Sequence, residues 1–309
     1  MVGGYRAPRV RVAAGGSAAL TAQLGLLDWS WEPTVLCGVL AAVLAYAMAL
    51  RRGVLKPSDD VSRWYGSSRW RPAFFMTGVL LSFIALQSPI DRGGDDFLFW
   101  LHMVQHLILM MAAPPFLLLG LCGMHPLDRA RFTAIRRAWR LATRPWVALV
   151  IFNVVMLTWH IPVLYDTTLT TEPVHVLEHL SFIGVGVLLW WPVIDPIRDA
   201  ETRLVSSPTR IAMLVIAGVP TTVLGLIFAL APTPFYSFYA RAPRLWGISP
   251  LGDQQIGGVL MLFASNLIFF VAIVIIFMRM LSDPARDEEM AAQRLAGDEQ
   301  GHHLAGAVQ

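Results

Sequence analysis

The sequence predicts an all-α integral membrane protein that folds as a bundle of seven transmembrane helices. Two properties of its composition point to a membrane protein. Hydrophobic residues make up 56% of the 309 residues and charged residues only 15%, whereas soluble domains carry about 25% charged residues. The third observation is that the apolar residues form seven segments near the roughly 20 residues that a helix needs to cross the hydrocarbon core. The same composition excludes a disordered chain.

The seven segments are continuous apolar runs, which favour helices over the alternating strands of a membrane barrel. Breakers or charges bound them: Pro33 opens the first segment, Arg51 and Arg52 close it, and Pro145 opens the fourth. The segments cover residues 33–50, 73–89, 97–121, 145–164, 174–191, 210–231 and 256–280.

The connections between the segments predict the orientation of the bundle. Two of them are rich in Lys and Arg, the connection over 51–72 and the one between the third and fourth segments. The connection over 90–96 holds only Arg92, and the one over 165–173 holds no Lys or Arg. By the positive-inside rule the basic connections are cytoplasmic. We therefore expect the N-terminus outside and the C-terminus in the cytoplasm.

Polar segments flank the predicted membrane domain, which we place at residues 28–281. Residues 1–27 are polar and lack the apolar run of a strong signal peptide. Residues 282–309 are expected to form a short cytoplasmic tail. His302 and His303 lie in that tail with no third ligand nearby, so we do not expect a metal site there.

Five of the eight histidines lie within or at the edge of the third, fourth and fifth segments: His102, His106, His160, His175 and His179. The members of two pairs are four residues apart, and on a helix such residues share a face. With the predicted orientation all five fall in the outer leaflet. Ionisable groups inside a membrane are costly and usually mark function, so we expect a metal or haem site here.

The neighbouring side chains favour copper modestly over other metals. Imidazole suits copper, zinc, iron and nickel, and thioether sulfur selects Cu(I). Met103 lies beside His102 and is a weaker candidate ligand, although packing is the commoner role of such a methionine. Glu178, one residue before His179, is expected to orient a histidine or to place a carboxylate beside the ligands. The His175–His179 stretch also fits the inverted zinc-protease pattern, but nothing indicates a peptide-binding domain.

Asp253 and three other aspartates lie near predicted outer ends of segments. We expect Asp253 to cap the seventh helix, with a place at the polar mouth of the metal site as the alternative. The other three are expected in a solvated outer loop, with attraction of cations as their second role: Asp91, Asp95 and Asp96.

Two further pairs of residues have local consequences. Pro114 and Pro115 fall near the middle of the third segment, where they either kink it or are simply tolerated, as prolines often are in membrane helices. Cys37 and Cys122 are predicted near opposite membrane faces and so cannot form a disulfide within one chain. Both are interpreted as packing residues, and a copper role for Cys37 is the less favoured alternative.

At the five histidines and the stretches around them the sequence resembles the CtaG family of cytochrome c oxidase assembly factors, multi-spanning proteins of the bacterial plasma membrane. The resemblance runs from about residue 28 to residue 280. It is carried by the stretches His102–His106, Ala113–Gly120, Trp159–Pro162, His175–His179, Trp190–Pro196 and Ser249–Gly258.

The resemblance implies a non-enzymatic factor that matures a haem–copper oxidase. Its five histidines would bind copper and supply it to the copper centre of the oxidase membrane subunit. An extracytoplasmic copper donor would be a second partner, the lipid bilayer surrounds the chain, and no nucleic acid is expected. Two alternatives remain open: a membrane oxidoreductase that binds haem or iron, and a copper transporter. The apolar inner halves of the third to fifth segments argue against the transporter.

Overall fold

The computed structural model describes the whole chain except residues 1–23, 26, 55–67, 124–132, 197–204 and 283–309. The described part is all-helical and contains no β-strand. The predicted tail, with His302 and His303, lies outside the described residues, except for Ser282, and so does most of the predicted 1–27 segment.

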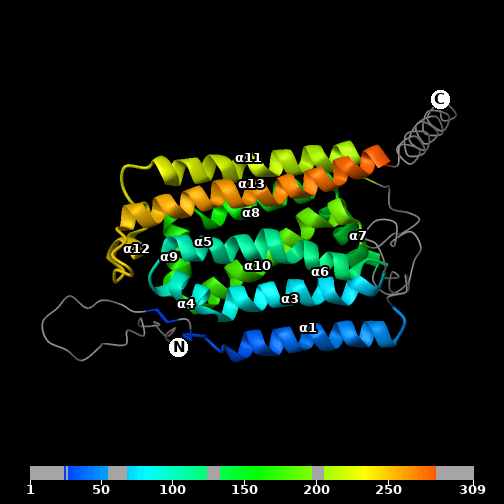
Figure 1. Ribbon diagram of the computed structural model, residues 1–309, viewed down its shortest axis with the longest axis horizontal. Helices are drawn as coiled ribbons and strands as arrows, with labels where there is room; N and C mark the ends of the chain where they lie inside the picture. The colour runs from blue at the N-terminus through cyan, green and yellow to red at the C-terminus, as the bar shows by residue number, and fades with distance from the viewer. Residues whose placement is uncertain (1–23, 26, 55–67, 124–132, 197–204, 283–309) are drawn as a thin grey trace, which may run out of the picture.

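The long helices run along the longest axis of the molecule and pack side by side as a bundle (Figure 1). They are α1 (Pro33–Arg51), α3 (Arg71–Gln87), α5 (Phe99–Leu107) with α6 (Ala113–Leu121), α8 (Pro145–Trp159), α10 (Glu172–Ile194), α11 (Ser207–Leu230) and α13 (Pro250–Ser282). The short elements are the 3₁₀ turn η1 (Ser68–Trp70), the π-helical turn η2 (Ile108–Ala112), α4 (Pro89–Asp96), α7 (Thr133–Ala142), α9 (Pro162–Thr170) and α12 (Ser237–Arg241).

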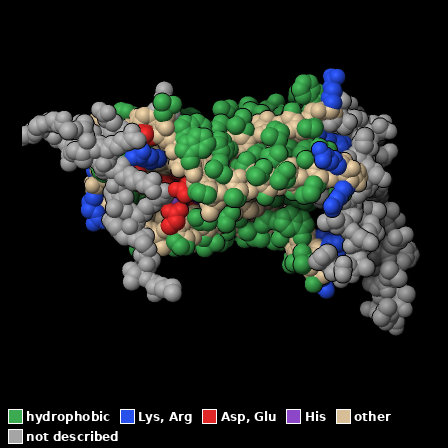
Figure 2. Space-filling model, turned by 90° about the horizontal axis from the view of Figure 1, so that it is seen from below, with side chains coloured by type: hydrophobic (Ala, Val, Ile, Leu, Met, Phe, Trp, Pro, Cys, Tyr) green, Lys and Arg blue, Asp and Glu red, His purple; other side chains and the backbone are tan. Residues whose placement is uncertain are grey.

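Among the described residues, five helical segments are long and apolar enough to cross a membrane. Two pairs of consecutive helices, α3 with α4 and α7 with α8, meet the same criterion when each bent pair is taken as one span. The predicted seven is therefore the upper end of a range from five to seven. Figure 2 shows the matching surface, where hydrophobic side chains cover the middle and Lys and Arg lie towards the ends. The prediction of a helical membrane protein is confirmed in this form.

Two predicted loops are helices in the structure, and one predicted segment is too long. Residues 90–96 belong to α4, and most of 165–173 belongs to α9 or α10. The fourth segment was expected to reach residue 164, but α8 ends at Trp159. Pro162 has no N–H to continue the helix, and the residue before a proline is kept out of the α conformation. Pro89 and Pro162 instead become first residues of new helices.

The short helices α4, α9 and α12 gather at one end of the bundle, while α7 lies at the other (Figure 1). Side-chain hydrogen bonds join them. Asp166 of α9 accepts from the backbone N–H of Ser237 at 3.1 Å and of Phe238 at 3.3 Å, at the start of α12. Tyr239 of α12 donates to the carbonyl of Gly94 in α4 at 2.6 Å. These contacts close the end of the bundle where α5 and α10 begin.

The two prolines of the third segment follow a π-helical turn instead of breaking the span. The segment Phe99–Leu121 still counts as one span. In a regular helix the carbonyl of Met110 would accept from the N–H of residue 114, which proline lacks. That carbonyl lies against Gly186 of α10, where an added Cβ would collide with it and with Pro114. Close packing of α10 on η2 therefore requires glycine at position 186.

This contact predicts a difference between two glycines of α10. Gly186→Ala should lower the free energy of unfolding by about 1–3 kcal/mol because the methyl group overpacks the contact with η2. Gly184→Ala is the matched control, because nothing lies within 4 Å of an added Cβ there, and it should leave stability unchanged or raise it. Thermal unfolding of the two variants in detergent measures the difference, and equal midpoints would contradict it.

Candidate metal centre

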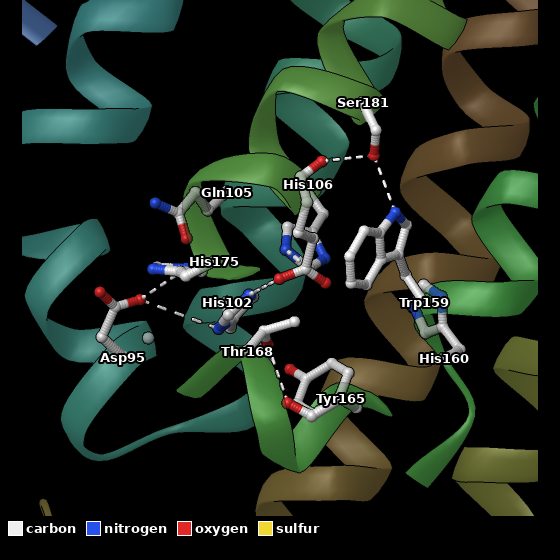
Figure 3. A network of polar contacts seen from close by, with 12 residues as sticks. Asp95, His102, Gln105, His106, Trp159, His160, Tyr165, Thr168, His175 and Ser181 are labelled. Carbon is white, nitrogen blue, oxygen red and sulfur yellow. Dashed lines mark hydrogen bonds and ion pairs between the residues drawn. The ribbon is translucent and has the colours of Figure 1, made fainter. Parts of the chain in front are cut away.

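The structure brings the five predicted histidines together, and Figure 3 labels four of them, His102, His106, His160 and His175. His102 and His106 lie on one face of α5, and His175 and His179 on one face of α10, with ring centroids 4.1 Å apart in each pair. The two helices face each other, so that the rings of His102 and His175 are 5.5 Å apart. His160 follows the last residue of α8, and its ring is 6.3 Å from that of His106.

Four buried side chains form the tightest group: His102, His175, Glu178 and His179. One ligand atom from each lies within 4.8 Å of the other three. A tetrahedral metal with bonds of about 2.0 Å holds its ligand atoms about 3.3 Å apart, so modest side-chain rotation would bring these atoms to binding distance. Glu178, expected to orient a histidine or to place a carboxylate beside the ligands, is itself a member of the group. Neither Glu178 nor His102 has any exposed surface.

The hydroxyl of Tyr239 determines which nitrogen of His102 carries the proton. Burial raises the pKa of Tyr239 well above its usual value, so the phenol keeps its proton, and it donates that proton to the carbonyl of Gly94. The Nδ1 atom of His102, 3.2 Å from the same hydroxyl, must then be the donor of their hydrogen bond. The lone pair of His102 is therefore on Nε2, which is 3.8 Å from Oε2 of Glu178.

His160 has the same tautomer for a related reason. Its Nδ1 lies 2.7 Å from the carbonyl oxygen of Met156, and because a carbonyl only accepts, Nδ1 must carry the proton. The lone pair is again on Nε2. Both histidines therefore turn to the interior the nitrogen that can bind a metal, a common arrangement in which the other ring nitrogen is fixed by a hydrogen bond.

Several buried polar atoms of the cluster have no hydrogen-bond partner among the described residues. They are Nε2 of His102, His106, His160, His175 and His179, Nδ1 of His106, and both carboxylate oxygens of Glu178. Buried polar groups in proteins are almost always partnered. A carboxylate oxygen facing an imidazole lone pair is repulsive unless a proton or a cation lies between them. The donor set therefore fits a bound cation that prefers nitrogen and oxygen ligands.

Asp95 lies beside this cluster, a position that the sequence did not predict. Its Oδ1 atom is 3.4 Å from Nε2 of His175 and 3.9 Å from Nδ1 of His102 (Figure 3). The side chain is 16% exposed, so Asp95 lies between the cluster and the surface. Gly94 allows this position, because an added Cβ there would come within 2.8 Å of the backbone nitrogen of His102.

Asp91 and Asp95 both lie in α4, so the expectation that they belong to a solvated outer loop is wrong. Asp91 is 8% exposed and accepts hydrogen bonds from Oγ of Ser30 at 2.6 Å and from Nε2 of Gln105 at 2.8 Å. It joins the segment before α1, helix α4 and helix α5. Its role in the structure is to hold these elements together beside the histidines.

Asp253 caps a different helix from the one expected. Its two carboxylate oxygens accept from the backbone N–H groups of Phe99 at 2.8 Å and of Trp100 at 3.0 Å, in the first turn of α5. The residue before that turn, Leu98, provides no side-chain cap. The prediction that Asp253 caps its own helix is wrong because α13 begins beside the start of α5. Asp253 thus fixes the helix that carries His102.

Met103 and the two cysteines are not among the four residues of the group. Met103 is 1% exposed and packs in an apolar cluster with Phe99 and Phe228, against Gly257 of α13. Cys37 is exposed and Cys122 is buried, and the Cys122 thiol donates to the carbonyl of Leu118 at 3.5 Å. The surroundings of Met103 favour the packing interpretation.

Comparison with known proteins identifies the family. The model of the cytochrome c oxidase caa3 assembly factor family, Caa3_CtaG, matches residues 44–283. The chain belongs to this family. The match confirms the resemblance seen in the sequence, and it includes all five histidines and Glu178.

Two curated relatives are more distant. Uncharacterized protein Mb0105 of Mycobacterium bovis and uncharacterized protein MT0111 of Mycobacterium tuberculosis are each 23% identical to the chain over 286 residues. The alignments cover 85% of this chain but only 40% of each relative, so the chain spans less than half the length of these relatives. No solved structure matches the chain.

The cap of α5 predicts a graded loss of stability. Asp253→Ala should lower the free energy of unfolding by about 1–2 kcal/mol because it removes both acceptors from the first turn of α5. Asp253→Asn should lose less, since its amide oxygen still accepts one of the two N–H groups. Thermal unfolding in detergent should give the highest midpoint for the wild type, a lower one for Asp253→Asn and the lowest for Asp253→Ala. An alanine variant as stable as the wild type would contradict the capping role.

Proposed function

We propose that this assembly factor binds copper at His102, His175, Glu178 and His179 and supplies it to the copper centre of a haem–copper oxidase. Membership of the family indicates a role in cytochrome c oxidase assembly. The observation that carries the copper proposal is the group of four ligand atoms within 4.8 Å, to which His102 contributes an unprotonated Nε2. Three of the four ligands are imidazoles, which suit copper.

The proposed orientation places this site near the outer face of the bacterial plasma membrane. The helices α4, α9 and α12 lie at the end of the bundle where α5 and α10 begin, and α7, with Arg136, Arg137 and Arg140, lies at the other end (Figure 1). The histidines of α5 and α10 are near the first residues of those helices. A basic helix at the opposite end favours a cytoplasmic position for that end. Copper would then enter from the extracytoplasmic side, supplied by a donor protein there, and leave towards the membrane subunit of the oxidase.

Asp95 supports entry of the ion at this end. Its carboxylate is partly exposed and 3.4 Å from His175, so a cation can meet Asp95 before it reaches the fully buried Glu178. A negative group at the mouth of a site raises the local concentration of cations. The proposed role is binding and transfer of an ion, with no catalysed reaction, because the cluster supplies metal ligands and needs no further substrate.

Copper content tests the site. Full-length protein purified in detergent after growth with copper should hold copper in near-stoichiometric amount and show no Soret band. The double variant His102→Ala with Glu178→Gln should hold at least about 10-fold less copper, because ligands and the residues that orient them each contribute strongly to affinity. His302→Ala with His303→Ala is the control and should keep its copper.

Three other outcomes would contradict the proposal in different ways. Haem or iron in the purified protein would favour the oxidoreductase alternative. Unchanged copper in the double variant would place the metal elsewhere in the chain. A wild type without copper, under conditions where the protein is folded, would leave the cluster without a copper function.

The orientation has its own test. A C-terminal fusion to green fluorescent protein should fluoresce in cells, and a C-terminal fusion to alkaline phosphatase should be inactive, because the first folds in the cytoplasm and the second needs the oxidising exterior. An active phosphatase with a dark fluorescent protein would reverse the proposed topology.

A further inference from the structure

His106 and His160 belong to the histidine cluster but not to the four-residue group. His106 is 3% exposed, and neither of its ring nitrogens has a hydrogen-bond partner among the described residues. His160 is 7% exposed, and its buried Nε2, which carries no proton in the tautomer described above, has no hydrogen-bond partner among the described residues. Two more buried imidazoles beside a complete set of four ligands exceed what one tetrahedral ion uses.

The separation of the two rings suits binding of one ion between them. With metal–nitrogen bonds of about 2.0 Å, two imidazoles on opposite sides of an ion have ring centroids about 6 Å apart. The centroids of His106 and His160 are 6.3 Å apart. Phe182 contacts this pair, with its ring 4.5 Å from that of His106 and 6.5 Å from that of His160. The space beside the two histidines is therefore walled by an aromatic side chain.

Two contacts fix the backbone that presents His160. The hydroxyl of Tyr236 donates to the carbonyl of His160 at 3.0 Å. The indole of Trp159 donates to Oγ of Ser181 at 2.8 Å, and that hydroxyl in turn donates to the carbonyl of Glu178 at 2.7 Å (Figure 3). The end of α8 is thus tied to the turn of α10 that carries Glu178.

The carboxylate of Glu178 faces both groups of histidines with different oxygens. Oε2 lies 3.8 Å from Nε2 of His102, and Oε1 lies 3.7 Å from Nε2 of His106. A carboxylate in this position can bind one ion through each oxygen. In known two-metal sites the ions are about 3.5–4 Å apart, a spacing that a bridging carboxylate accommodates.

We propose that His106 and His160 form a second copper position, bridged by Glu178 to the four-residue site, so that a loaded chain carries a pair of ions. This inference rests on the proposed copper function. The charges favour Cu(I): two monovalent ions balance the two carboxylates of Glu178 and Asp95, whereas two divalent ions would leave net charge buried in the membrane, which is costly.

Stoichiometry of Cu(I) binding tests the inference. The full-length protein, in a His302→Ala/His303→Ala background that removes the tail histidines, is reduced, loaded with Cu(I) against a competing chelator, and measured for copper per chain. The parent should bind about two ions, as a two-metal site requires. His160→Gln should bind about one, and His106→Gln serves the same purpose if that variant is not recovered. The one retained ion shows that the variant is folded.

The outcomes separate this inference from the proposed function. A parent that binds one ion, kept in His160→Gln and lost in His102→Ala/Glu178→Gln, would overturn the second position and leave the copper function intact. Loss of all copper in His160→Gln would place His160 in a single shared site and also overturn it. Two ions retained in His160→Gln would place the second ion elsewhere. A parent that binds none would overturn both proposals.

Discussion

The buried carboxylate of Glu178 constrains the rest of this structure. It has no exposed surface, and a charged group without partners in the low-dielectric interior of a membrane protein is very costly. The groups that surround it are imidazoles, which can be neutral ligands or carry a proton. The contacts with His102 and His106 are longer than hydrogen bonds, at 3.8 and 3.7 Å. The carboxylate thus lies close to both rings without a hydrogen bond to either, and the proposed copper ion would supply the missing partner.

The helices that carry this cluster are held in place by contacts outside it. Three buried polar contacts do this at the closed end. Asp253 fixes the start of α5, Asp91 ties α5 to the segment before α1, and Tyr239 joins α12 to α4 and orients His102. None of these side chains belongs to the four-residue group. They hold the helices in place while Nε2 of His102, His175 and His179 and both oxygens of Glu178 have no hydrogen-bond partner among the described residues.

The sequence predicted the parts of this picture that depend on local pattern. Hydropathy located the long helices, and the four-residue spacing of His102 with His106 and of His175 with His179 placed each pair on one face. The basic connections predicted that all five histidines lie on the same side of the membrane. From this we could expect the two histidine pairs to lie near each other. What local pattern cannot show is a contact between distant residues. Asp253 and Phe99 are 154 positions apart, and no spacing rule connects them. Asp95 joins the site only because α4 is a helix that folds back against α5, where a solvated loop was expected.

The π-helical turn at Ile108–Ala112 has a consequence for helical phase. A π turn holds one more residue than an α turn, and each residue of an α-helix rotates its side chain by about 100° around the axis. The extra residue therefore offsets the faces of α5 from those of α6 by about that angle. His106, two residues before the turn, faces Glu178 and His179, while Gly120 beyond it packs against Phe75 of α3. One span thus presents a histidine face in α5 and a packing face in α6, and the two faces point in different directions. Residues of the histidine face can therefore change without changing the residues that pack on α3.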